Sequence, residues 1–289
     1  MTLLAIGAAA VLVLPVAAAA AQTGSGALWQ SDFTGSGFSQ FKSTPYNNVG
    51  ASAPVLVTST VAPPAQAAQF TVPAGGTRSE IEPNVATFVE GSDYYFGDSI
   101  TLPATFPTAE SSWQVITQWK NDGTGSPPVE LKVGNGNVLI DGGYGYPTGP
   151  RLWSKTVGPA ATGRQINLVV HILFSSNPAV GSLDVWMDGT QVISGYKPPG
   201  GTLYPAFTKK KASPQQAAAQ TAAAQKTPKP KGTPTEPAAA PNQAVTASTT
   251  TSQFSYWKMG LYRDPAIKSN ASYYIESARQ ATSYAGAAG

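Results

Sequence analysis

Two short segments carry charged and amide side chains at alternate positions, the spacing that places them on one face of a β-strand. Arg78 and Glu80 alternate in the first segment, and Ile116, Gln118 and Lys120 alternate in the second. Guanidinium, ammonium and amide groups can neutralise a carboxylate and stabilise negative charge as it develops. The two segments therefore indicate recognition of an anionic ligand, although an Arg-x-Glu pair is also typical of an ion pair on a solvated sheet face.

A third segment, residues 256–262, alternates polar and apolar side chains over its whole length. Tyr256, Lys258 and Tyr262 fall on one face, while the opposite face is apolar and is predicted to join the core. Gly260 removes a side chain from the middle of the polar face, which predicts room for a ligand close to the backbone. Together, the three segments could build a groove lined by Arg, Gln, Lys and Tyr side chains.

The composition excludes several other kinds of site. The 289 residues contain no cysteine and one histidine, His171, so neither a disulfide framework nor a thiolate or multi-histidine metal site is possible. A Ser-His-Asp triad would have to use His171, and no serine lies in a G-x-S-x-G motif. We therefore expect no catalytic metal and no cofactor, and only a structural calcium ion stays open.

The net charge of +3 is unevenly distributed. Residues 208–250 hold six lysines and one glutamate, which leaves +5 there and −2 in the rest of the chain. These lysines lie among Ala, Pro, Gln and Thr, a composition that disfavours a nucleic-acid partner. The same segment has too little apolar surface to offset the entropy of ordering, so it is predicted to be a disordered loop insertion.

The apolar residues 3–21 precede Gln22 and end in a run of alanines, as in a secretory signal peptide. We expect residues 1–21 to be removed by cleavage near Ala20 or Ala21, with a retained anchor as the alternative. No other segment reaches the roughly 20 apolar residues of a membrane span. The mature protein is therefore expected to be secreted and to have no membrane partner.

Residues 27–205 divide into short runs rich in Val, Ile, Thr and aromatic residues, separated by clusters of Gly, Pro, Asn and Asp. This pattern predicts an all-β sandwich of two sheets in one domain, residues 22–280, interrupted by residues 208–250. Residues 281–289 are expected to form a flexible tail. The clearest strands are predicted at residues 113–119, 129–133, 166–174, 183–187 and 256–262.

The motifs R-S-E at residues 78–80, Q-W-K at 118–120 and Y-W-K-M-G-L-Y at 256–262 occur in the order seen in jelly-roll polysaccharide lyases. Over residues 27–276, apart from the insertion, the chain resembles the alginate-lyase, glucuronan-lyase and heparin-lyase-I-like group. The resemblance implies a concanavalin A-like β-jelly-roll of two antiparallel sheets that binds uronic-acid chains and cleaves them by β-elimination. The implied partner is an acidic polysaccharide, and a monomer is expected.

The resemblance also implies a role for the polar residues of the three motifs. β-Elimination removes the weakly acidic C5 proton of a uronate, so the adjacent carboxylate must be neutralised, and Arg78, Gln118 and Lys120 are suitable donors. Tyr262 is implied as the catalytic base and acid. Lys258, four residues before it, is expected to supply the positive charge that favours an ionised phenol.

Glu80, Tyr256 and His171 complete, with Lys120, the predicted substrate-binding set. His171 lies among large apolar residues in the segment INLVVHILF. This setting favours a place in the core or at the edge of the groove over a catalytic role.

Lys120 stands where lyases of this group often carry a histidine, which serves as the base in anti elimination. In glucuronate and mannuronate, the C5 hydrogen and the C4 oxygen lie on the same face of the ring, so one tyrosine can serve both. The chain is therefore predicted to perform syn elimination on a glucuronate- or mannuronate-type polymer, with guluronate a poor substrate. A non-catalytic carbohydrate-binding jelly roll is the alternative, while a hydrolase is disfavoured because no E-x-D-x-x-E strand supplies paired carboxylates.

Overall fold

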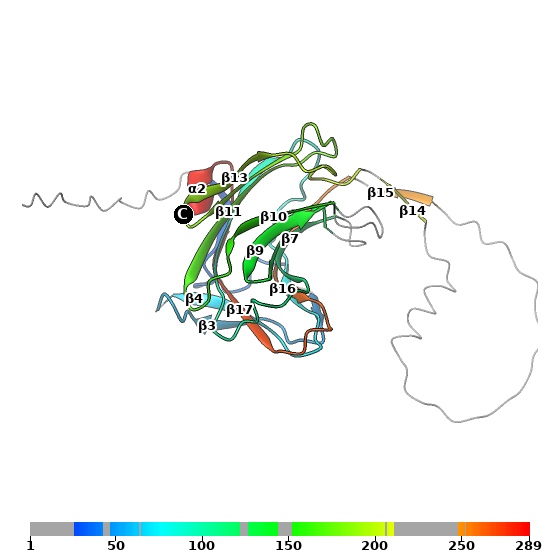
Figure 1. Ribbon diagram of the computed structural model, residues 1–289. Helices are drawn as coiled ribbons and strands as arrows, with labels where there is room; N and C mark the ends of the chain where they lie inside the picture. The colour runs from blue at the N-terminus through cyan, green and yellow to red at the C-terminus, as the bar shows by residue number, and fades with distance from the viewer. Residues whose placement is uncertain are drawn as a thin grey trace, which may run out of the picture.

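The computed structural model describes residues 26–42, 47–63, 65–121, 127–143, 152–205, 207–210, 248–251 and 253–289. Nearly half of these residues form two antiparallel sheets that pack into a sandwich (Figure 1). The predicted all-β sandwich of two antiparallel sheets is confirmed. The five clearest predicted strands begin and end within one residue of their expected bounds.

The larger sheet has eight strands. Its spatial order is β13 (Thr190–Tyr196), β12 (Ser182–Met187), β11 (Gln165–Leu173), β6 (Asp93–Thr101), β17 (Ala271–Ala281), β4 (Gln66–Val72) and β3 (Val55–Thr58), and β1 (Ala27–Ser31) also pairs with β17. The smaller sheet has seven strands. Its order is β10 (Trp153–Pro159), β9 (Asn137–Gly142), β8 (Val129–Gly134), β7 (Gln114–Lys120), β16 (Tyr256–Arg263), β5 (Arg78–Ile81) and β2 (Asn47–Val49).

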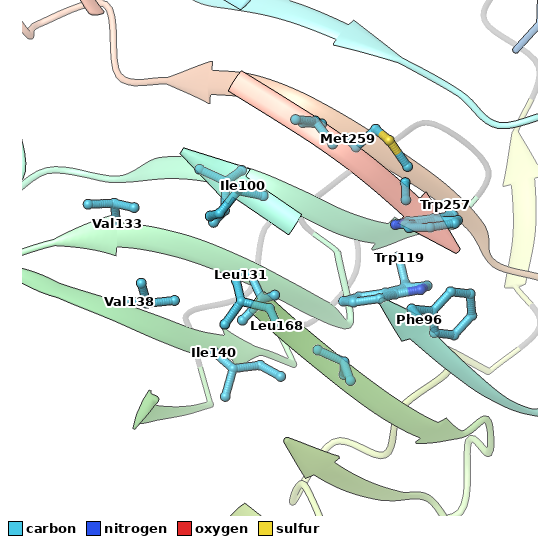
Figure 2. Packing of buried hydrophobic residues seen from close by; sticks show 14 of the residues in the cluster. Phe96, Ile100, Trp119, Leu131, Val133, Val138, Ile140, Leu168, Trp257 and Met259 are labelled. Carbon is cyan, nitrogen blue, oxygen red and sulfur yellow. The ribbon is translucent and has the colours of Figure 1, made fainter. Parts of the chain in front are cut away.

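The hydrophobic core fills the space between the two sheets (Figure 2). Trp119 on β7 and Trp257 on β16 are fully buried, and each meets the ring of Phe96 on β6 edge to face at a centroid distance of 5.1 Å. Because side chains alternate along a strand, burying these tryptophans turns Gln118, Lys120 and Lys258 to the opposite face of the seven-stranded sheet. We call this outward surface the polar face.

The last two strands of the chain occupy central positions in the sandwich, where Figure 1 shows them in orange and red. β16 lies between β7 and β5, and β17 lies between β6 and β4. The pairing of β16 places Tyr262 opposite Arg78 on β5 and Lys258 opposite Gln118 on β7. The three sequence motifs are therefore adjacent strands of one sheet.

A β-bulge changes the face on which Ile116 lies. Strict alternation predicts that Ile116 shares the face of Gln118 and Lys120, but its side chain is buried in the core. The pairing of β7 with β8 shifts register between Val115 and Thr117, and one extra residue in a strand reverses the alternation beyond it. Val115 consequently takes the polar face in place of Ile116.

The C-terminus differs from the expected flexible tail of residues 281–289. Ala281 ends β17, and a short helix, α2 (Tyr284–Ala288), follows it. Ser283 caps this helix by accepting a hydrogen bond from the backbone N–H of Gly286, and Ala287 packs against Val169 on the outer face of the eight-stranded sheet. The cap and the small apolar residues thus give the end of the chain a fixed place.

Two other predicted segments lie wholly or largely outside the described residues. The predicted signal peptide, residues 1–21, is outside them, as are residues 211–247 of the predicted insertion. The two ends of that insertion are ordered, contrary to expectation, because β14 (Phe207–Lys210) pairs with β15 (Ser248–Thr251). Among the described residues, no helix has the length and apolar character needed to cross a membrane.

The buried carboxyl of Asp98 generates a stability prediction. Asp98 lies on β6 between the core residues Phe96 and Ile100, and burial raises its pKa to about 7, although a hydrogen bond with Thr117 opposes the shift. The folded protein therefore holds a proton that the unfolded chain has released, so stability falls as the pH rises from about 4 to 7. Asp98→Asn should remove this loss and stabilise the protein at pH 8 by up to roughly 4 kcal/mol relative to its effect at low pH.

Urea unfolding of the wild type and Asp98→Asn at pH 4 and pH 8 measures this difference. The variant should show a smaller loss of unfolding free energy between the two pH values. Equal losses in the two proteins would contradict a protonated Asp98 in the folded state.

Candidate active site

A groove of about 270 Å³ opens on the polar face. Its lining residues come from β5, β7, β8 and β16 and from the segments that flank them: Arg78, Trp113, Val115, Gln118, Lys120, Pro127, Glu130 and Tyr262. Four of the predicted site residues, Arg78, Gln118, Lys120 and Tyr262, therefore line a single groove. Trp113, Pro127 and Glu130 were not anticipated from the sequence.

Glu80 lies at the centre of a buried network beside the groove. Its side chain accepts a hydrogen bond from Gln118 Nε2 at 2.5 Å, and its Oε2 atom lies 3.3 Å from Arg78 Nε and 3.7 Å from Lys258 Nζ. Burial raises the pKa of Glu80, while Lys258, Arg78 and the hydrogen bond from Gln118 act in the opposite direction. Glu80 is 1% exposed and does not line the groove, so it orients the donor groups instead of facing a ligand as predicted.

Two neighbours fix the ring of Tyr262. The guanidinium carbon of Arg78 lies 3.9 Å from the ring centroid, and the indole of Trp113 meets the ring edge to face at 4.6 Å. Lys258 is the cation expected beside Tyr262, whereas the structure places Arg78 over the ring because Tyr262 and Arg78 are paired across β16 and β5. Among the hydrogen bonds of the described residues, none uses the Tyr262 hydroxyl, which leaves this group available at the groove.

Lys258 and Tyr256 belong to the side of the network that lies away from Tyr262. Lys258 is buried and lies 3.7 Å from carboxylate oxygens of both Glu80 and Glu82. Tyr256 lies near two cations, with Lys42 Nζ at 5.6 Å and Lys258 Nζ at 5.8 Å from its ring centroid. Neither Lys258 nor Tyr256 lines the groove itself, and Lys42 and Glu82 are members of the network that the three motifs do not contain.

Lys120 has an altered acidity. Burial and the positive charge of Lys258 lower its pKa to about 8, with a smaller effect in the same direction from Arg78. Glu130, which pairs with Gln118 from β8, acts in the opposite direction. A substantial fraction of Lys120 is therefore uncharged near pH 8, where an ordinary lysine is almost entirely protonated.

Gly260 serves a different purpose from the one expected. It has φ +128°, and a Cβ at this position would lie 2.4 Å from the carbonyl oxygen of Ser79 and 2.8 Å from Glu80 Cα. The space beside Gly260 is thus filled by the backbone of β5 and not left open for a ligand. The glycine lets β5 and β16 approach closely enough for Glu80 to reach Lys258.

His171 does not join the site. It lies on β11 of the other sheet, where side-chain alternation turns it to the outer face, away from both the core and the groove. Its Nδ1 and Nε2 atoms lie 2.7 Å from Asp184 and 2.6 Å from Asp93, and its ring stacks on Tyr95. His171 therefore lies neither in the core nor at the edge of the groove, contrary to the expected position. Among the described residues, no cluster of three or more His, Asp or Glu side chains could hold a metal ion.

Comparisons with known proteins are consistent with this arrangement. A family model described as polysaccharide lyase matches residues 29–209, which include the first two motifs. No curated protein sequence matches the chain. The structure is similar to an endo-β-1,4-glucuronan lyase from the fungus Trichoderma reesei, with 14% identity, a TM-score of 0.56 and coverage of 90% of this chain and 98% of that one.

Two further solved structures have TM-scores of 0.47. One is the alginate lyase A1-II′, a member of polysaccharide lyase family 7, with 14% identity and coverage of 78% of this chain and 82% of that one. The other is the cellulose-induced protein Cip1, with 13% identity and coverage of 88% and 97%. At these identities, the likeness to the glucuronan lyase establishes the fold.

The charge balance around Glu80 predicts that neutralising Glu80 lowers the unfolding free energy much more than neutralising the neighbouring Glu82. Glu80→Gln removes the negative charge that compensates two cations, one of them buried, and should lower the unfolding free energy by about 3 kcal/mol. Glu82→Gln is the matched control. Glu82 also lies 3.7 Å from Lys258, but its side chain is partly exposed and its nearer cation is the exposed Lys42, so this substitution should cost less than about 1 kcal/mol. Chemical unfolding of both variants at neutral pH measures the difference, and equal losses would show that Glu80 is not the organising charge.

Proposed function

Because the chain belongs to the polysaccharide lyase family, we propose that it cleaves a glucuronate- or mannuronate-type polysaccharide by syn β-elimination. One observation carries this proposal: Tyr262 lines the same groove as Arg78, Gln118 and Lys120. The groove thus combines a proton-transfer group with cationic and amide donors for a carboxylate. These are the two kinds of group that elimination from a uronate requires.

The uronate carboxylate binds to Gln118, Arg78 and Lys120. As the C5 proton leaves, negative charge spreads from C5 into this carboxylate, and donors that are already in place stabilise it without reorganisation. Glu80 contributes indirectly, because its contacts with Gln118 and Arg78 hold both donors in orientation. Glu80 is therefore a positioning residue in this proposal.

Tyr262 carries out both proton transfers. Its phenolate oxygen accepts the C5 proton, the C5–H electron pair forms the C4–C5 double bond, and the bond between C4 and its glycosidic oxygen breaks. Tyr262 then donates the proton to the departing oxygen, which restores the phenolate. The Arg78 guanidinium, 3.9 Å from the ring centroid, holds the tyrosine ring in place at the groove.

The biological setting follows as part of the same proposal. We propose a secreted monomer that acts on an acidic polysaccharide outside the cell and needs no cofactor for the chemical step. The apolar residues 3–21 support export. A structural calcium ion remains compatible with this proposal, since it would take no part in the proton transfers.

Tyr262→Phe tests the base. The variant keeps the ring but lacks the oxygen that moves the proton, so turnover should fall by about 10³-fold or more. Elimination is followed through the ultraviolet absorbance of the unsaturated uronyl product. Tyr284→Phe, on α2 beside the other sheet, is the matched control and should retain activity. Wild-type protein that binds an acidic polymer but releases no unsaturated product from any would instead indicate a non-catalytic binding protein.

The substrate range tests the stereochemistry. At pH 7 we expect cleavage of glucuronan or polymannuronate, whose C5 hydrogen and C4 oxygen can both be served by Tyr262 from one face. Polyguluronate should react at least about tenfold more slowly, because its C5 hydrogen lies on the opposite face of the ring. Initial rates on the three polymers measure this preference, and efficient cleavage of polyguluronate at pH 7 would contradict syn elimination.

A further inference from the structure

One side chain that lines the groove, Glu130, has the same charge as the proposed substrate. It lies on the polar face of β8, and only 4% of the residue is exposed. Strand pairing places it directly opposite Gln118 on β7. The Cβ atoms of such a pair lie about 5 Å apart, so a sugar chain held at Gln118 passes close to Glu130. A groove for anions therefore holds an anion beside its carboxylate site.

The charge of Glu130 is costly for the pairing of β8 with β9. Glu130 lies opposite Asp141 on β9, and like charges that face each other directly destabilise a pair of strands. Lys132, the other charged residue on this face of β8, forms a buried ion pair with Asp141. Glu130 acts in the other direction, toward β7, where its charge favours the ammonium form of Lys120. The negative charge thus belongs to the groove.

We propose that Glu130 is a specificity-determining residue, which restricts the groove to uronate chains without sulfate groups. Its carboxylate accepts a hydrogen bond from a free hydroxyl of the bound chain and repels a sulfate group at the same position. This inference rests on the proposed function of the groove as a lyase site. It narrows the substrate class to unsulfated polyuronates.

The chemistry of the carboxylate supports this selectivity. An ionised carboxylate only accepts hydrogen bonds, and its two oxygens offer about four acceptor positions. Glu130 can therefore act on Lys120 and still accept a hydrogen bond from a sugar hydroxyl. A sulfate ester is negatively charged and has no hydrogen to donate, so it cannot take the place of the hydroxyl. Repulsion between two such charges is stronger beside a buried carboxylate than in water.

The cations of the groove alone would produce the opposite preference. Arg78 and Lys120 attract anions, and a sulfated chain has more negative charge than its unmodified parent. Attraction to these cations predicts that sulfation strengthens binding, whereas the Glu130 carboxylate predicts that sulfation weakens it. Specificity of this kind comes from a repulsive element set beside an attractive one.

The test uses the better substrate of the two polymers, glucuronan or polymannuronate, and the same polymer after random O-sulfation. In the wild type, sulfation should lower kcat/KM by at least about 100-fold. Glu130→Gln keeps the shape of the side chain but removes its charge, so it should narrow this ratio by about tenfold. Asp93→Asn removes an exposed carboxylate from the outer face of the other sheet and is the matched control, which should leave the ratio unchanged. Because the ratio compares two polymers in one protein, an effect of Glu130 on Lys120 cancels.

A competition measurement on the wild type needs no variant. Sulfated polymer, added at an equal concentration, should leave the rate on the unmodified polymer almost unchanged, because the groove excludes it. Strong inhibition would show that the groove accepts sulfated chains and would overturn the inference.

The other outcomes separate this inference from the proposed function. Equal kcat/KM values on the two polymers in the wild type would contradict the inference and leave the proposed function intact. An unchanged ratio in Glu130→Gln would also contradict it, since the shape of the groove would then exclude the sulfate. If neither unmodified polymer is cleaved, the proposed function fails, and this inference fails with it. Should Glu130→Gln not fold, Glu130→Ala replaces it and is expected to narrow the ratio as well.

Discussion

The buried carboxylate of Glu80 is the interaction on which the organisation of the groove depends. It joins its own strand, β5, to β7 through Gln118 and to β16 through Lys258, and it also contacts Arg78. In a buried setting, these charge-assisted contacts are stronger than they would be in water, and an uncompensated charge would be correspondingly costly. Without Glu80, the cations of β5 and β16 would lose their common partner. One carboxylate therefore helps both to hold the strands together and to orient the groups that face the ligand.

The core side of the same strands fixes the backbone beneath the groove. The hydroxyl of Thr117 accepts a hydrogen bond from Trp257 Nε1 and donates one to the carbonyl of Lys258, which joins β7 and β16 from below. Next to Tyr262, the buried guanidinium of Arg263 donates hydrogen bonds to the carbonyls of Val72, Pro73 and Ser269. This clamp fastens the end of β16 to β4 of the opposite sheet. Tyr262 thus sits on a strand that is held from the face opposite the groove.

Strand alternation was sufficient to predict the polar face, because Arg78, Gln118 and Lys120 lie on regular parts of their strands. Tyr262 keeps its predicted face although the pairing of β16 with β7 shifts register between Met259 and Tyr262. The alternation rule failed at the β-bulge in β7, which turns Ile116 into the core. No local pattern in the sequence indicates where this bulge lies. The contributions of Trp113 and Glu130 depend on neighbouring strands, so no single motif contains them. His171 was misplaced because an apolar segment reveals that a strand is buried but not which of two sheets it enters. Ser283, a typical N-cap residue, could have indicated the C-terminal helix, but the stability of this helix comes from packing against the eight-stranded sheet.

Arg78 in the groove and Lys258 beside it act on both the ligand and Lys120. Arg78 and Lys258 attract a polyuronate, and by the same field they weaken the hold of Lys120 on its proton. A bound carboxylate has the opposite effect, since a negative charge beside Lys120 favours its ammonium form. A bound uronate therefore favours the role of Lys120 as a cationic donor to the carboxylate. The order along β7 keeps this cation apart from Tyr262, because Gln118, oriented by Glu80, lies between Lys120 and Tyr262.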